Sequence, residues 1–186
     1  MTTLANKLSI LRILLIPVFI GSVLYYTPEK DFLRLIALGV FILAIITDAL
    51  DGYIARIRGE RGQLGAFLDP LADKLLLITV YICLAATKTL PMQFRLAPWV
   101  VIVVLSRDAI IVLGSVLIYM ATTQLKIAPT ILGKLTTFLQ MAAIVALLLQ
   151  LKLTPLIMCF MVFFTVLSGL DYIRLGTRQF NGVTVK

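Results

Sequence analysis

The 186-residue chain is 61% hydrophobic and 14% charged, with a mean hydropathy of +1.06. This composition excludes an ordinary soluble domain and indicates an integral membrane protein. The formal net charge of +8 fits contact with anionic lipid headgroups, and because no soluble basic domain accompanies it we expect no nucleic-acid partner. The sequence contains no histidine, which excludes a histidine nucleophile, general base or metal ligand.

Six apolar segments are long enough to cross a bilayer core of about 30 Å, which takes roughly 20 helical residues. They cover residues 8–27, 33–56, 66–89, 96–121, 131–151 and 154–176. The sequence therefore predicts an all-α integral membrane protein with six transmembrane helices, forming a single domain over residues 1–186. Cys83 and Cys159 lie inside apolar runs without metal-ligand or redox spacing, so we expect both to be reduced packing residues.

Basic residues are distributed unequally between the two sides of the predicted membrane domain. The richer side carries Lys7, Arg12, Arg56, Arg58, Arg61, Lys126, Lys134, Arg174, Arg178 and Lys186. The poorer side carries Lys30, Arg34, Lys88, Arg95 and Lys152. By the positive-inside rule, both termini and the connection between the second and third spans are predicted to be cytoplasmic.

Four aspartates flank that connection: Asp48, Asp51, Asp69 and Asp73. The first two are three residues apart and the last two are four apart, so each pair lies on one face of a helix. A carboxylate at membrane depth costs about 2.5–3.5 kcal/mol on insertion scales, which favours a functional site over a solvated loop. Because four carboxylates repel one another, we expect divalent cations between them, and all-oxygen ligands indicate Mg²⁺ or Mn²⁺ rather than zinc.

The same stretch resembles the signature of the CDP-alcohol phosphotransferase family. The pattern D-x2-D-G-x2-A-R-x8-G-x3-D-x3-D is matched at every position by Asp48, Asp51, Gly52, Ala55, Arg56, Gly65, Asp69 and Asp73. Residues 6–12 and 132–134 are also similar to the phosphatidyltransferase branch, so the resemblance covers most of the chain. It implies that the four aspartates hold two metal ions, that Asp73 is also the general base, and that the protein is a homodimer.

The resemblance also assigns a CDP-lipid site to small residues and one arginine around the aspartates: Gly52, Ala55, Arg56, Gly65 and Ala66. Four of these assignments have a simpler alternative. Gly52 and Ala55 are small enough to serve only helix packing, and Gly65 is suited to the start of the third helix. Arg56 is also suited to anchor the helix at the interface.

A second polar set lies in the fourth and fifth spans. Arg107 and Asp108 stand midway along the fourth span, where they form either a buried ion pair that fixes helix packing or a basic wall for an anionic acceptor. Lys134 is either an ordinary positive-inside lysine or, as the resemblance implies, a ligand of the acceptor's phosphate.

The resemblance implies transfer of a phosphatidyl group from CDP-diacylglycerol to glycerol 3-phosphate, giving phosphatidylglycerol phosphate and CMP. The site would be a cytoplasm-facing polar cavity in the bacterial inner membrane. The alternative acceptor is phosphatidylglycerol, as in the cardiolipin synthases, because Ser115 stands where the glycerophosphate enzymes usually carry a second arginine. An ion-coupled transporter is a more remote alternative, since intramembrane acids also mark ion pathways, but the chain lacks two related halves.

Overall fold

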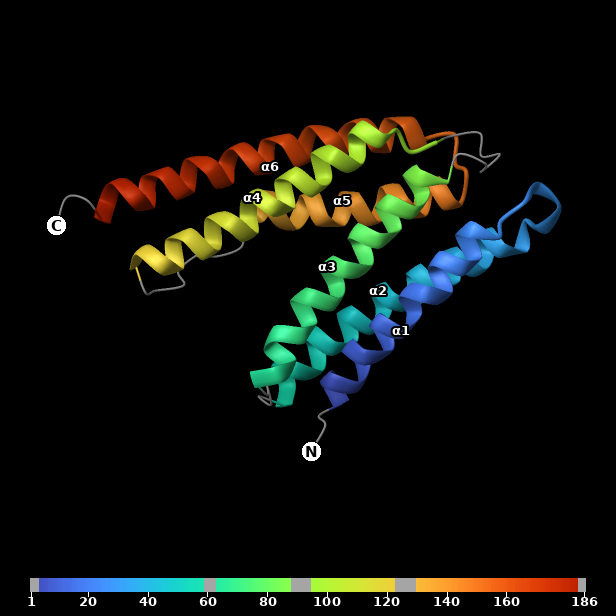
Figure 1. The fold of residues 1–186 in the computed structure, drawn as a ribbon, viewed down its shortest axis with the longest axis horizontal. Coiled ribbons are helices and arrows are strands. Elements are labelled where there is room, and N and C mark those ends of the chain that lie inside the picture. Colours follow the sequence, from blue (N-terminus) through green and yellow to red (C-terminus); the bar gives the residue numbers. More distant parts are fainter. Residues whose placement is uncertain (1–3, 59–62, 88–94, 123–129, 184–186) are drawn as a thin grey trace. The chain divides into compact units, whose positions relative to one another are not determined.

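The computed structural model describes the backbone of residues 4–58, 63–87, 95–122 and 130–183, and the side chains of residues 10–50, 74–87, 95–114, 130–175 and 177. In these ranges it contains six α-helices, one short 3₁₀ helix and no strand. Figure 1 shows them in the order α1 (Leu4–Leu24), η1 (Pro28–Lys30), α2 (Phe32–Arg58), α3 (Gln63–Ala86), α4 (Pro98–Thr122), α5 (Ile131–Leu148) and α6 (Thr154–Val183). The prediction of an all-α chain is confirmed over the described residues.

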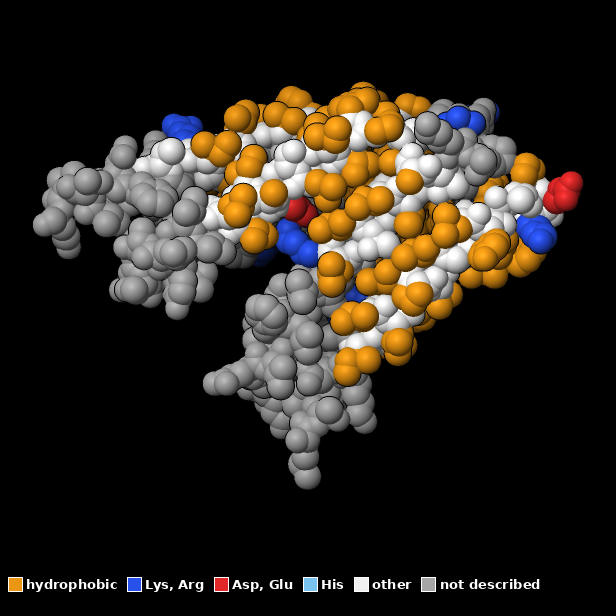
Figure 2. Space-filling model, in the orientation of Figure 1, with side chains coloured by type: hydrophobic (Ala, Val, Ile, Leu, Met, Phe, Trp, Pro, Cys, Tyr) orange, Lys and Arg blue, Asp and Glu red, His pale blue; other side chains and the backbone are white. Residues whose placement is uncertain are grey.

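The helices have the apolar character of a membrane protein. Three described segments are by themselves long and apolar enough to cross a membrane: Phe32–Leu50, Ile131–Leu148 and Thr154–Leu175. Shorter apolar stretches occur in α1 and α3, at Ile10–Leu24 and Lys74–Ala86. On the face shown in Figure 2, apolar side chains cover much of the described helices, and charged side chains appear at only a few places. The count of six spans remains a prediction.

Two helix ends differ from the prediction by more than three residues, and the others lie within three residues of it. Helix α1 begins at Leu4 rather than at residue 8, because a helix can start before its apolar face does. Helix α6 continues to Val183 instead of ending at residue 176, since apolar length marks the membrane core and not the limit of helical backbone.

Helix α5 ends at Leu148, three residues before the predicted end, because the chain turns sharply there. Gln150 adopts a left-handed backbone with φ 52°, the conformation that commonly terminates helices. The Leu151 amide then donates to the Ala146 carbonyl at 3.1 Å, and the Thr154 hydroxyl donates to the same carbonyl at 2.9 Å. These bonds satisfy a carbonyl that the ended helix would otherwise leave without a partner.

The chain forms two compact units, which we call unit 1 (residues 1–96 and 148–150) and unit 2 (residues 97–147 and 151–186). In unit 1, α1 packs against both α2 and α3 (Figure 1). The buried rings of Phe19 on α1 and Phe41 on α2 lie 6.4 Å apart, and Tyr81 on α3 is also buried. The contact of Phe19 with Phe41 therefore joins α1 to α2, one of the two helices that carry the aspartate motif.

In unit 2, α4 packs against α6. Helix α5 is tied to α6 by the buried Thr136 hydroxyl, which donates to the Phe164 carbonyl at 3.1 Å. Ile144 on α5 and Met161 on α6 are fully buried. That residues 1–186 form a single membrane domain remains a prediction.

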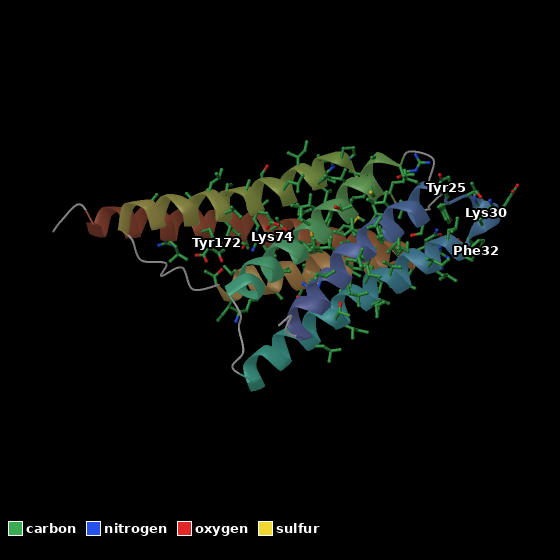
Figure 3. All side chains as sticks on the ribbon, turned by 60° about the horizontal axis from the view of Figure 1, so that its bottom comes forward. Tyr25, Lys30, Phe32, Lys74 and Tyr172 are labelled. Carbon is green, nitrogen blue, oxygen red and sulfur yellow. The ribbon has the colours of Figure 1, made fainter. Side chains whose placement is uncertain are left out.

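An ion pair closes the connection between α1 and α2. Arg34 donates two hydrogen bonds to Asp31, from Nε to Oδ1 at 2.8 Å and from Nη2 to Oδ2 at 2.7 Å, and its Nη1 donates to the Leu148 carbonyl at 2.7 Å. These bonds from Arg34 lower the pKa of the Asp31 carboxyl. The Tyr26 hydroxyl also donates to Asp31 Oδ1, at 3.2 Å. Figure 3 labels three of the exposed residues near this connection, Tyr25, Lys30 and Phe32.

Candidate active site

The four predicted metal ligands lie on two helices of unit 1. Asp48 and Asp51 belong to α2, and Asp69 and Asp73 belong to α3. Both stretches are helical, so the spacing within each pair places its two residues on one helix face. The side chains of Asp51, Asp69 and Asp73 lie outside the described side chains, and Asp48 is the member whose carboxylate the structure positions.

Asp48 forms an ion pair with an arginine of α1. The Arg12 Nη1 atom lies 2.9 Å from Asp48 Oδ1, and the two side chains are 1% and 40% exposed, respectively. From the sequence, Arg12 was interpreted as part of the N-terminal similarity, of the basic cytoplasmic flank and of an amphipathic entry to the first span, without a specific partner. Its position inside the apolar run of residues 10–16 was the signal for a partner, because a cation at membrane depth requires an acid or a polar neighbour.

The donor chemistry of the aspartate cluster fits a hard divalent cation. Among the described side chains no group of three or more His, Cys, Asp or Glu residues could hold a metal, and three of the four predicted ligands are not among those side chains. Carboxylate oxygens are the ligands that Mg²⁺ and Mn²⁺ prefer. The Asp48 carboxylate uses one oxygen for Arg12 and is 40% exposed, so it remains open to a further ligand.

The residues predicted to bind the CDP-lipid occupy the neighbouring helix ends. Gly52, Ala55 and Arg56 lie in the last turns of α2, and Gly65 and Ala66 lie in the first turn of α3. Their side-chain surroundings lie outside the described part of the chain. Their role in binding therefore stays a prediction.

Arg107 of unit 2 is buried, with 6% of its surface exposed, and it joins three helices. Its Nη1 donates to Asp108 Oδ1 at 2.7 Å, and its Nη2 donates to the Ser168 hydroxyl on α6 at 3.1 Å and to the Gly133 carbonyl on α5 at 3.4 Å. The guanidinium carbon also lies 6.0 Å from the ring centre of Tyr172. The buried ion pair considered from the sequence is thus present.

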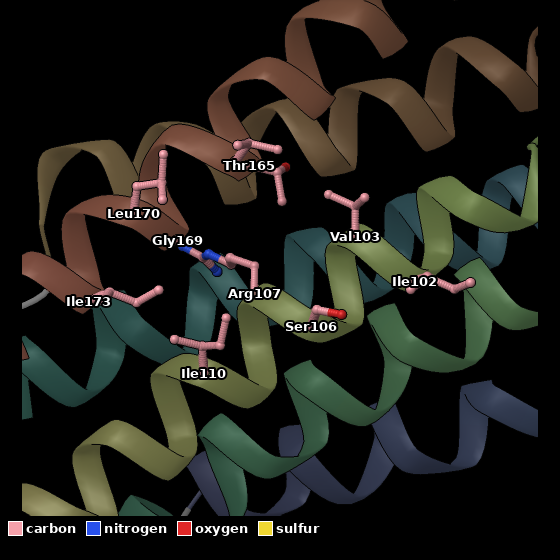
Figure 4. Close-up of a pocket in the computed structure, with 10 residues that line it drawn as sticks. Ile102, Val103, Ser106, Arg107, Ile110, Thr165, Gly169, Leu170 and Ile173 are labelled. Carbon is pink, nitrogen blue, oxygen red and sulfur yellow. The ribbon is translucent and has the colours of Figure 1, made fainter.

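Arg107 also lines a pocket of about 250 Å³ between α4 and α6 (Figure 4). The pocket wall is largely apolar and is formed by Ile102, Val103, Ser106, Arg107, Ile110, Thr165, Val166, Gly169, Leu170 and Ile173. One arginine therefore fixes helix packing and faces a cavity at the same time, so the two interpretations made from the sequence do not exclude each other. Lys134 is exposed on α5 and directly follows Gly133, whose carbonyl Arg107 contacts.

Comparisons with known proteins cover nearly the whole chain. The model of the CDP-alcohol phosphatidyltransferase family matches residues 2–167. A probable phosphatidylglycerophosphate synthase of Mycobacterium tuberculosis is 33% identical, over 97% of this chain and 84% of the relative. The CDP-diacylglycerol–glycerol-3-phosphate 3-phosphatidyltransferase of Bacillus subtilis is 37% identical, over 92% of this chain and 94% of the relative. The cardiolipin synthase (CMP-forming) of Homo sapiens is 32% identical, over 95% of this chain and 62% of the relative.

Proposed function

Because the chain belongs to the CDP-alcohol phosphatidyltransferase family, we propose that it transfers a phosphatidyl group from CDP-diacylglycerol to glycerol 3-phosphate, releasing CMP. The observation that carries this proposal is the complete aspartate motif on α2 and α3. It is supported by the near full-length similarity to bacterial proteins named for the same reaction. The product is phosphatidylglycerol phosphate.

Asp48, Asp51, Asp69 and Asp73 would hold two Mg²⁺ or Mn²⁺ ions. Bound there, the ions would neutralise the diphosphate of the CDP-lipid and stabilise CMP as the leaving group. Arg56 adds a cationic contact to the diphosphate, since a guanidinium pairs well with phosphate oxygens. Small residues on both helices leave room for the cytidine nucleotide: Gly52, Ala55, Gly65 and Ala66.

Asp73 accepts the proton of the acceptor hydroxyl as this oxygen attacks the phosphorus that carries diacylglycerol. A new phosphorus–oxygen bond forms to the acceptor, and the bond between this phosphorus and the CMP oxygen breaks. Transfer is direct, without a covalent enzyme intermediate. The absence of histidine from the sequence and the location of both cysteines outside the aspartate motif support this step.

Arg107 and Lys134 bind the phosphate of glycerol 3-phosphate. A guanidinium has five N–H donors, so Arg107 retains donors beyond the bonds to Asp108, Ser168 and Gly133. Lys134, the residue after Gly133 on α5, adds the positive charge of an ammonium group on a flexible side chain.

A second acceptor, phosphatidylglycerol, is favoured by two observations. Ser115 supplies no charge where a second arginine is expected in glycerophosphate enzymes, which suits a singly charged phosphodiester. The wall of the α4–α6 pocket is largely apolar, which suits an acceptor with acyl chains. The product would then be cardiolipin.

The deciding experiment offers each acceptor separately to the purified protein with CDP-diacylglycerol and Mn²⁺ or Mg²⁺. We expect CMP release with glycerol 3-phosphate, and none after the metal is removed by EDTA. Release with phosphatidylglycerol alone would replace the acceptor and leave the rest of the mechanism in place. The absence of metal-dependent CMP release with either acceptor would instead contradict the transferase proposal and reopen the transporter alternative.

We further propose six membrane spans in the bacterial inner membrane, with both termini and a polar active-site cavity on the cytoplasmic side. The unequal distribution of basic residues supports this orientation. Family similarity supports a homodimer embedded in membrane lipids.

A further inference from the structure

Arg12 is buried in unit 1 although it carries a permanent charge. Its side chain is 1% exposed. Long basic side chains in membrane helices normally extend toward the headgroups and keep their charge in water. A guanidinium that stays buried needs a charged or polar partner, because desolvation of an unpaired charge is highly unfavourable. The contact between Arg12 Nη1 and Asp48 Oδ1 at 2.9 Å supplies that partner.

The contact leaves Asp48 able to bind something else. A carboxylate has two oxygens with about four lone-pair sites, so one charge-assisted bond to Oδ1 leaves Oδ2 available. The side chain of Asp48 is 40% exposed, whereas that of Arg12 is closed off. The arginine thus approaches the carboxylate from the protein interior, while part of the carboxylate surface remains open.

Arg12 and Asp48 belong to different helices, which makes the contact a constraint on the orientation of the carboxylate. Arg12 is on α1 and Asp48 is on α2, and these helices pack together in unit 1. A hydrogen bond from outside the metal shell fixes the rotation of a ligand, and its loss typically reduces metal affinity about 10–100-fold. A fixed cation also reduces repulsion among neighbouring carboxylates before a metal binds.

We propose that Arg12 is a positioning residue for the metal site. Its guanidinium holds Asp48 in the orientation that binds a divalent cation. The guanidinium itself contacts neither substrate. This inference rests on the proposed function, in which Asp48 is one of four metal ligands. The competing role is purely structural, a clamp between α1 and α2 without influence on metal binding.

Unit 1 offers a matched control in the ion pair of Arg34 with Asp31, whose Nη2–Oδ2 distance is 2.7 Å. Arg34 lies fourteen residues before Asp48 on the same helix, which corresponds to about 21 Å at a rise of 1.5 Å per residue. Replacing Arg34 therefore removes a comparable ion pair of the same unit at a distance from the aspartate motif.

The test measures Mn²⁺ binding to the purified full chain in detergent, without substrate, by electron paramagnetic resonance. We expect Arg12→Gln to weaken Mn²⁺ binding about 10–100-fold. Arg12→Lys keeps the charge but not the planar fork, so it should recover part of the affinity. Arg34→Gln should lower the thermal unfolding temperature without changing Mn²⁺ affinity. In an Asp48→Asn background, Arg12→Gln should cause a smaller loss of affinity than in the wild type, because Arg12 acts through Asp48.

Activity gives an independent readout. Arg12→Lys should raise the Mn²⁺ concentration needed for half-maximal CMP release by a larger factor than it lowers kcat at saturating Mn²⁺. Wild-type Mn²⁺ affinity in both folded Arg12 variants would overturn the positioning role and leave the aspartate site intact. A wild-type chain that binds no Mn²⁺ would overturn the proposed metal site, and this inference with it.

Discussion

Asp73 has two proposed roles at the level of a single residue, as a metal ligand and as the general base. Asparagine at this position keeps the shape but cannot accept a proton. We expect Asp73→Asn to lower turnover about 10²–10⁴-fold, the usual contribution of a general base. The affinity for CDP-diacylglycerol should change less. Single-turnover measurements with saturating CDP-lipid separate the two, and a defect in binding alone would leave Asp73 as a metal ligand only.

Gly133 sits where a side chain would press on Arg107. A Cβ atom at this position would lie 3.2 Å from Arg107 Nη2, 3.2 Å from Thr130 Oγ1 and 3.5 Å from Tyr172 Cε2. Because Asp108 already holds Arg107 at 2.7 Å, the guanidinium cannot shift without weakening that bond. We expect Gly133→Ala to raise the KM for glycerol 3-phosphate about tenfold, equivalent to about 1.4 kcal/mol of binding.

Gly114→Ala on α4 is the matched control for this substitution, since an added Cβ there meets nothing within 4 Å. It should leave KM unchanged and stabilise the helix by about 0.5–1 kcal/mol. Steady-state kinetics and thermal unfolding of the two variants provide the measurement. Equal KM values would show that Gly133 does not constrain the position of Arg107.

The aspartates were predictable from the sequence because their spacing is a local property of two helices. The partners of Arg12 and Arg107 on other helices were not predictable from the sequence. The sequence contained the burial signal for Arg12, but its partner Asp48 lies 36 positions later on another helix. Arg107 was assigned two alternative roles, and only the placement of Gly133 and Ser168 from α5 and α6 shows how it fulfils the structural one while lining a pocket.

At the level of helices, the carboxylate of Asp31 pairs with Arg34 at the start of α2. Arg34 lowers the pKa of Asp31, so the carboxyl binds a proton less readily in the folded chain than in the unfolded chain. The resulting stability is present above the unfolded pKa near 3.8 and is lost as the pH falls through the lower folded pKa. Because the Asp31 side chain is 50% exposed, solvent screening keeps the contribution small.

We therefore expect Asp31→Asn to lower the unfolding temperature in detergent by about 1–4 °C at pH 6, with the difference from wild type shrinking toward pH 3. Differential scanning fluorimetry at both pH values measures this change. A difference of constant size across the range would mean that the ion pair does not contribute. Arg34→Gln should show the same pH dependence, although it also loses the bond to the Leu148 carbonyl.

For the whole molecule, the sequence predicted the all-α class because the length of each apolar segment can be read directly from it. Six apolar segments became six helices, while three of the described segments are by themselves long and apolar enough to cross a membrane. The grouping of α1 with α2 and α3, and of α4 with α6, was not predictable. It depends on which side chains meet across helices, such as Phe19 with Phe41, and periodicity does not identify such partners.

The predicted membrane topology can be tested with three exposed positions, Lys30, Lys152 and Thr177. Four predicted spans separate Lys30 from Lys152, and one separates Lys152 from Thr177. The first two should therefore share the less basic, outer face, and the third should be cytoplasmic. Single cysteines at these positions, in a Cys83→Ala and Cys159→Ala background, are treated with a membrane-impermeant maleimide in intact spheroplasts. Lys30→Cys and Lys152→Cys should react at once, and Thr177→Cys only after permeabilisation. Labelling of Lys30→Cys and Lys152→Cys from opposite sides would require an odd number of spans between them and exclude the six-span topology.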